Sequence, residues 1–175
     1  MAPIEFELKP VNRITTDAIG EPGKRVFYLQ GRSGTQLVTL LIEKQQVQSL
    51  AIGVEQFLQD LQERMPDLPN ASAEFFEDEM GLEKPIDPSF RIGQIGLGYD
   101  EETDMMVLVA REYTGESEDD ENASVARFWC TRTQLRAMCH WGLELAGRGR
   151  PICGNCGEPI DLEGHFCPKR NGHKH

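Results

Sequence analysis

Two segments of this chain share one order: a hydrophobic run, a three-residue polar elbow, and a run with helical periodicity. The first covers residues 40–50 and the second covers residues 127–137. After the first elbow, apolar residues recur every three or four positions to about Met65, and Pro66 then ends the helix. Because each strand leads almost directly into its helix, the helix must pack on the sheet that the strand belongs to. The pattern therefore predicts an α+β fold.

The hydrophobic pattern also predicts most of the strands and both helices. Residues 4–8 alternate between apolar and charged side chains, as in a half-buried strand. Turn sequences at Ser33-Gly34 and at 100–104 join further strands into two hairpins. The remaining strands are expected over 25–30, 36–42, 90–99, 105–113 and 125–130, and the helices over 44–65 and 132–147. We therefore expect two strand-hairpin-helix units that form an antiparallel sheet with two main helices packed on it.

The apolar face of the second predicted helix has six members. They are Leu135, Met138, Cys139, Gly142, Leu143 and Ala146.

Residues 66–88 separate the two units. They contain four prolines and the acid-rich stretch 74–79, which is typical of a solvated connecting loop. The alternative is that Phe75 and Phe76 pin a short helix of this segment to the rest of the fold.

The similarity of the two units indicates an internal duplication within a body of residues 1–148. Residues 25–65 would then correspond to residues 93–147, with Leu40–Leu50 aligned to Arg127–Ala137. The alternative is that strand–turn–helix is a common local pattern and that no duplication exists.

The charge of the chain limits its partners. Acidic residues number 29 against 18 basic ones, which gives a net charge of −11. A surface that coats DNA or RNA needs clustered lysine and arginine, so nucleic acid is not an expected partner of the body. The chain lacks an apolar run of about 18 residues, the length that predicts a membrane span. The N-terminus also lacks the features of a signal peptide. We expect a cytoplasmic protein with no membrane partner.

Cysteine usage and composition set the last residues apart. Glycines, arginines and a proline at 147–151 mark a linker, and a tail of residues 149–175 follows. Three of the five cysteines lie in this tail. An odd number of cysteines with such clustering favours metal binding over a disulfide framework.

The tail carries the clearest chemical motif of the sequence. Cys153 and Cys156 are separated by two residues and followed by glycine, the form of a zinc knuckle. His165 and Cys167 can face the same way on an extended segment and complete a tetrahedral site, with His173 as a competing fourth ligand. The tail has too little apolar material to fold alone, so bound Zn²⁺ would stabilise it. Four protein ligands make such a site structural rather than catalytic.

Other residues carry weaker signals. Cys139 and His140 are adjacent on a predicted helix, where their side chains point about 100° apart, so they form a poor nucleophile–base pair. The glycines of 93–98 lack the lysine and the following helix of a phosphate-binding loop, and indicate a bent strand. The acidic residues of 100–104 lack the spacing of a calcium loop and indicate a solvated hairpin tip. Five arginines are expected to balance nearby acidic charge rather than bind nucleic acid: Arg127, Arg132, Arg136, Arg148 and Arg150.

Several of these motifs occur together in one known family. They are Gly-Glu-Pro-Gly-x-Arg-x-Phe-Tyr-Leu-Gln at 20–30, Leu-Ile-Glu-Lys-Gln-Gln-Val at 41–47, Phe-Arg-Ile-Gly-x-x-Gly-Leu at 90–97, and the two cysteine motifs of 149–157 and 163–172. Over nearly the whole chain the sequence resembles the uncharacterised bacterial family called domain of unknown function 3090. Members of that family are often encoded near a histidine-phosphatase-like protein and a phosphoinositide-kinase-like protein, which implies a phosphate-related pathway. The resemblance implies a zinc-binding tail with ligands at Cys153, Cys156, His165 and Cys167, and it transfers no catalytic residues.

Three functions are compatible with these features. The first is a non-enzymatic interaction or adaptor module with a structural zinc site and another protein as its partner, because no nucleophile–base or carboxylate pair stands out. The second is an enzyme with its site in the cleft between the two halves, which convergent polar groups would favour. The third is a nucleic-acid-binding protein that uses the tail and the nearby arginines, which a continuous positive face would favour.

Overall fold

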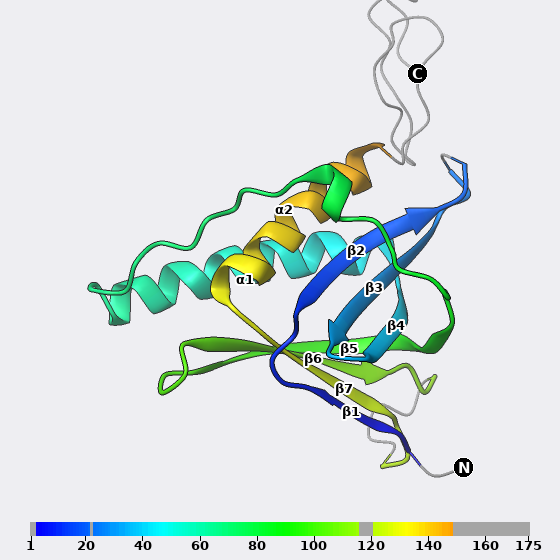
Figure 1. The fold of residues 1–175 in the computed structure, drawn as a ribbon, viewed down its shortest axis with the longest axis horizontal. Helices are drawn as coiled ribbons and strands as arrows, with labels where there is room; N and C mark the ends of the chain where they lie inside the picture. The colour runs from blue at the N-terminus through cyan, green and yellow to red at the C-terminus, as the bar shows by residue number, and fades with distance from the viewer. Residues whose placement is uncertain (1–2, 22, 116–120, 149–175) are drawn as a thin grey trace, which may run out of the picture.

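A seven-stranded sheet and two long helices make up the fold. The computed structural model describes residues 3–21, 23–115 and 121–148. Its strands are β1 (Glu5–Leu8), β2 (Arg13–Ile19), β3 (Val26–Ser33), β4 (Gln36–Ile42), β5 (Pro88–Asp100), β6 (Met105–Glu112) and β7 (Val125–Cys130). Its helices are α1 (Lys44–Arg64), α2 (Arg132–Arg148) and the short 3-10 helix η1 (Glu77–Glu79). Both long helices cover the same side of the sheet (Figure 1), so the α+β prediction with two helices packed on a sheet is confirmed.

The sheet is mixed, and the prediction of a wholly antiparallel sheet is therefore wrong. The strand order is β1-β7-β6-β5-β4-β3-β2. β4 pairs in parallel with β5 and β1 pairs in parallel with β7, whereas the other neighbours are antiparallel. The chain connection explains the parallel pair of β4 and β5. After β4, α1 and residues 65–87 carry the chain back to the level at which β4 begins, so β5 runs in the same direction as β4.

β2 is the strand that the hydrophobic pattern misses. Its burial does not alternate, since Thr15 and Thr16 are buried beside Ile14. Thr15 Oγ1 donates to the carbonyl of Met80 at 2.7 Å, and Thr16 Oγ1 donates to that of Tyr28 at 2.8 Å. Both hydroxyls are thus satisfied inside the fold, and two buried polar residues remove the alternation by which a strand is recognised.

A four-residue link joins the two ends of the sheet. β1 and β2 lie at opposite ends of the strand order, yet only residues 9–12 separate them in the chain. Within this link, Val11 N donates to Trp129 O on β7 at 2.9 Å and Asn12 N donates to Arg32 O on β3 at 2.7 Å. The sheet therefore curls until its two ends meet at the link, and the helices cover the concave space.

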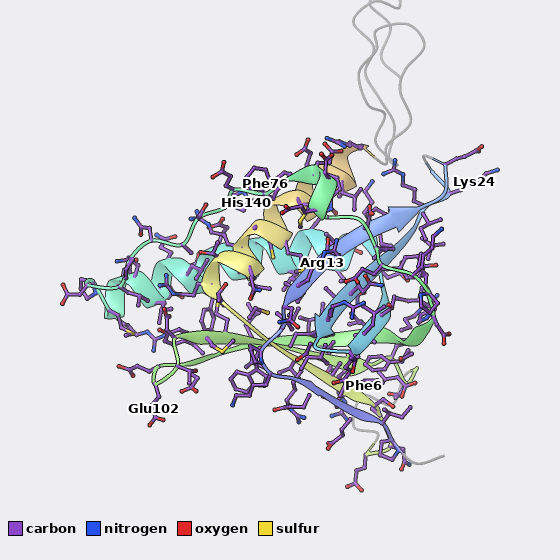
Figure 2. All side chains as sticks on the ribbon, viewed as in Figure 1. Phe6, Arg13, Lys24, Phe76, Glu102 and His140 are labelled. Carbon is purple, nitrogen blue, oxygen red and sulfur yellow. The ribbon has the colours of Figure 1, made fainter. Side chains whose placement is uncertain are left out.

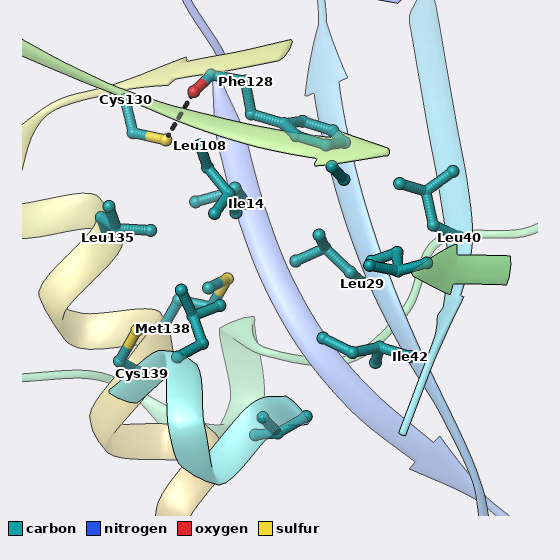
Figure 3. Packing of buried hydrophobic residues seen from close by; sticks show 14 of the residues in the cluster. Ile14, Leu29, Leu40, Ile42, Leu108, Phe128, Cys130, Leu135, Met138 and Cys139 are labelled. Carbon is teal, nitrogen blue, oxygen red and sulfur yellow. Dashed lines mark hydrogen bonds between the residues drawn. The ribbon is translucent and has the colours of Figure 1, made fainter. Parts of the chain in front are cut away.

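The core fills the space between the curled sheet and the helices. Figure 3 shows Leu29, Leu40 and Phe128 from the sheet facing Leu135 and Met138 of α2. On α1 the buried positions follow the predicted periodicity: Val47, Leu50, Ala51, Val54 and Leu61.

The buried face of α2 differs from the prediction at Leu143, Trp141 and Leu145, of which the last two are buried without having been predicted. Leu143, which was expected to face the core, is 41% exposed, whereas Trp141 is only 4% exposed. Trp141 donates its indole N–H to Thr16 O at 2.8 Å and lies against Phe75, with ring centroids 5.6 Å apart. Phe75 thus holds residues 66–88, the connecting segment, to α2, while Phe76 is 62% exposed.

Candidate functional site

The predicted metal ligands lie outside the residues that the structure describes. Cys153, Cys156, His165, Cys167 and the alternative ligand His173 all belong to residues 149–175. Within the described ranges, histidine, cysteine, aspartate and glutamate side chains form no group of three or more that could hold a metal ion.

The two cysteines of the body have structural positions. Cys130 on β7 and Cys139 on α2 are both buried among core residues. Burial raises the pKa of the Cys139 thiol to about 12, and it also raises the pKa of the Cys130 thiol. Both thiols therefore stay protonated at neutral pH, and neither is an activated nucleophile.

One polar cluster joins the two helices. The carboxylate of Glu55 on α1 accepts a hydrogen bond from Arg136 Nε at 2.9 Å and contacts His140 Nε2 through the same oxygen. Arg136 also donates to Ala71 O at 2.5 Å. The hydrogen bond from Arg136 is the main reason that the pKa of Glu55 lies below its ordinary value, and His140 acts in the same direction.

This cluster occupies the place where an enzyme acting between the two halves would have its site. His140 lies at the surface of α2 (Figure 2) and its ring faces Glu55 rather than Cys139, which is buried. The carboxylate is engaged by two basic side chains, so it connects the helices and is not a free base. As expected from their adjacent positions on a helix, the side chains of Cys139 and His140 point in different directions.

The arginines that cluster in the sequence have acidic partners within the body. The pairs are Arg127 with Glu7, Arg132 with Asp104, Arg136 with Glu55, and Arg148 with both Glu77 and Glu144. Arg150 lies outside the described residues. For the four described arginines, intramolecular charge balance is the role that the ion pairs support, as the sequence predicted.

A groove of about 560 Å³ lies between the first half of α1 and β5. Its apolar wall is formed by Leu50, Ile95 and Leu97 with Gly53, and its rim is polar: Glu43, Gln45, Gln46 and Ser49. At one end, Gln46 Nε2 donates to Ile92 O on β5 at 3.1 Å. The wall is suited to apolar side chains and the amide rim to a peptide backbone.

A second groove of about 550 Å³ lies between α2 and β2. It is lined by residues of the β2 end and of α2, among them Ile14, Gln134 and Ala137. At one end, Gln134 Nε2 donates to Val11 O at 3.3 Å. The remaining wall is the chain's own connecting segment, over residues 74–80.

The fold and the grooves define an α+β protein with a curled mixed sheet, a helix pair on one side of it, and a groove between each helix and the sheet. The chain belongs to the family described as protein of unknown function (DUF3090), whose sequence model matches residues 6–167. The family resemblance inferred from the sequence motifs is therefore confirmed. No curated protein and no solved structure matches the chain. Neither long helix in the described part of the chain has the length and apolar character needed to cross a membrane.

Proposed function

We propose that this protein is a non-enzymatic interaction module whose C-terminal segment holds one structural zinc ion. The ligands are Cys153, Cys156, His165 and Cys167. The spacing of these residues carries the proposal: Cys-x-x-Cys-Gly is followed by His-x-Cys in the same short segment. Three thiolates and one imidazole form a closed tetrahedral set, which is the chemistry of a structural zinc site.

Two observations support this choice of ligands. The match to the family ends at residue 167, so it includes His165 and Cys167 but not His173. The other two cysteines, Cys130 and Cys139, are buried in the body with raised thiol pKa values. The three cysteines of the tail are therefore the thiols that remain for a metal ion.

The proposal of an interaction module rests on the body. The polar cluster between the helices is engaged in internal ion pairs, and Arg127, Arg132, Arg136 and Arg148 each have an acidic partner. The groove between α1 and β5 instead offers an apolar wall and an amide rim, which suit the backbone and side chains of a polypeptide. A protein is therefore the proposed partner.

Metal content of matched variants tests the proposal. Protein purified without added metal should contain about one zinc ion per chain, and Cys156→Ser should lose it. His165→Ala should lower the zinc content, whereas His173→Ala is the matched control and should retain the metal. The reverse result for the two histidines would replace His165 by His173 as ligand. Zinc near zero in the unsubstituted protein would overturn the proposed function.

A further inference from the structure

The two grooves occupy equivalent positions in two units of the fold. β2, β3, β4 and α1 form one unit, and β5, β6, β7 and α2 form the other. In each unit three strands that pair antiparallel in chain order lead into the helix. The last strand of each unit pairs in parallel with a strand outside that unit: β4 pairs with β5, and β7 pairs with β1. Residues 9–12 join β1 to β2, the first strand of the first unit.

The helix N-termini show how the units correspond. Gln46 Oε1 accepts from the backbone N–H of Glu43 at 2.8 Å, and Gln134 Oε1 accepts from that of Thr131 at 2.8 Å. The side chains of the same two glutamines donate to the other unit, Gln46 to Ile92 O on β5 and Gln134 to Val11 O just before β2. Gly53 follows Gln46 by seven residues, and Trp141 follows Gln134 by seven residues. Gly53 and Trp141 therefore occupy equivalent positions on α1 and α2.

Beside the groove between α2 and β2, that position holds an indole, which packs on Phe75 in the groove wall. The indole of Trp141 reaches Thr16 O on β2 and lies against Phe75 of the connecting segment. β2 holds this segment through its backbone: Thr15 Oγ1 donates to Met80 O at 2.7 Å and Arg13 Nε donates to Glu79 O at 3.0 Å. The chain that follows α1 thus forms one wall of this groove, and in Figure 1 it runs back over α2 towards β2.

In the groove between α1 and β5, the same position is a hollow. A Cβ on Gly53 would meet only Leu97 Cδ1, at 4.0 Å, so no described neighbour requires glycine there. Glycine in a helix interior is nevertheless less stable than alanine by about 1 kcal/mol. Beside it, Ile52 is 69% exposed. Among the described residues, only β5 and α1 with its cap Glu43 line this groove.

We propose that the C-terminal segment, residues 149–175, docks in the groove between α1 and β5. It follows α2 as the connecting segment follows α1, so it occupies the corresponding place over the other helix. The helices are antiparallel, and Gly142 lies against Val47 near the start of α1. The described end of α2 therefore lies near the N-terminal half of α1, the half that lines the groove.

The composition of the segment suits this role. It is no shorter than residues 66–88, which include the segment that walls the other groove. Its basic residues outnumber its acidic ones, so it approaches the acidic body without net repulsion. Its larger apolar side chains are available to cover Leu97 and the hollow at Gly53: Ile152, Ile160, Leu162 and Phe166. The inference goes beyond the proposed zinc site, because it follows from the body and not from the metal ligands. It also makes this segment a competitor of the partner protein proposed above, since both would bind the same groove.

Hydrogen exchange of the full-length protein tests the docking. Gly53→Trp places an indole in the groove, as Trp141 does in the other unit, and Gln56→Trp places the same ring on an exposed position of α1. We expect amides within 149–175 to exchange roughly tenfold faster in Gly53→Trp than in the unsubstituted protein. Gln56→Trp should leave their exchange unchanged. Equal exchange in all three proteins would overturn the proposal.

Photo-crosslinking decides the question even if Gly53→Trp does not fold. A photoreactive phenylalanine analogue at Ser49, on the rim, should form crosslinks within one chain to residues 149–175, and the same analogue at exposed Glu5 on β1 should not. Crosslinks from Ser49 only to a second copy, or to none of these residues, would overturn the docking. Zinc content measured on the same samples separates the two proposals, since normal zinc without docking contradicts only this inference.

Discussion

Glu55 is the residue through which the two helices are most directly connected. Its pKa is lowered chiefly by the hydrogen bond from Arg136, so its ionised form favours the folded state above the ordinary value of 4.5. This contribution is lost as the pH falls from 4.5 through the lower pKa of the folded state. Because the pair is partly exposed and screened by solvent, Glu55→Gln should lower the free energy of unfolding by roughly 0.5–1 kcal/mol at pH 7.

Urea unfolding of this variant at several pH values measures the effect. The deficit of Glu55→Gln relative to the unsubstituted protein should shrink below about pH 4. Glu63→Gln, on an exposed position of the same helix, is the control and should change little at any pH. A deficit that stays constant from pH 7 to pH 3 would contradict this account of Glu55.

Gly142 is required by the contact between the helices. A Cβ there would lie 2.8 Å from Val47 Cγ1 and 3.1 Å from Thr16 Cγ2. Overpacking of about 1–3 kcal/mol outweighs the gain of up to about 1 kcal/mol in helix propensity, so Gly142→Ala should destabilise the protein by roughly 1–2 kcal/mol. Gly147→Ala on the same helix meets nothing within 4 Å and should be neutral or stabilising in thermal unfolding. Equal melting temperatures for the two variants would refute this explanation.

At the scale of the elements, the connecting segment depends on one of two adjacent phenylalanines. Phe75 packs on Trp141, whereas Phe76 is largely exposed. Phe75→Ala should lower the free energy of unfolding by roughly 1.5–3 kcal/mol, less than for a fully buried ring. Phe76→Ala should stay within about 0.5 kcal/mol. Chemical denaturation of both variants compares them, and an equal loss for each would show that the segment is not held in this way.

The elements that follow a hydrophobic period could be predicted, and those that depend on tertiary contacts could not. Both long helices and six of the strands follow from periodicity in the sequence, because most of their buried residues are apolar. The periodicity does not predict β2, because Thr15 and Thr16 are buried there. The hydroxyls of these two threonines donate to the carbonyls of Met80 and Tyr28, which are distant in the chain. Likewise, Trp141 rather than Leu143 is buried because β2 and Phe75 cover it. The grooves depend on such long-range packing, so local sequence patterns do not reveal them.

At the scale of the whole molecule, we propose that the body arose by duplication of a β-β-β-α unit. Matching helix caps and matching parallel pairings support the proposal. The caps align Glu43 with Thr131, one residue away from the alignment that the sequence alone favours. The first unit also includes β2, which lies before residue 25.

Metal removal should affect the tail and spare the body. All residues of the core cluster belong to the body. Their burial therefore does not depend on the proposed zinc site. A chelator should therefore speed hydrogen exchange after residue 148 and leave both long helices protected. Loss of protection across α1 and α2 would instead show that zinc organises the whole fold.

The central claim is a closed zinc site in the C-terminal segment, and zinc content measured together with thiol reactivity tests it most directly. Protein purified without added metal should hold about one zinc ion per chain, with its three tail thiols protected from alkylation. A chelator should then expose Cys153, Cys156 and Cys167 to the reagent, while Cys130 and Cys139 stay buried. Zinc near zero, with all three tail thiols reactive before any chelator is added, would contradict the account.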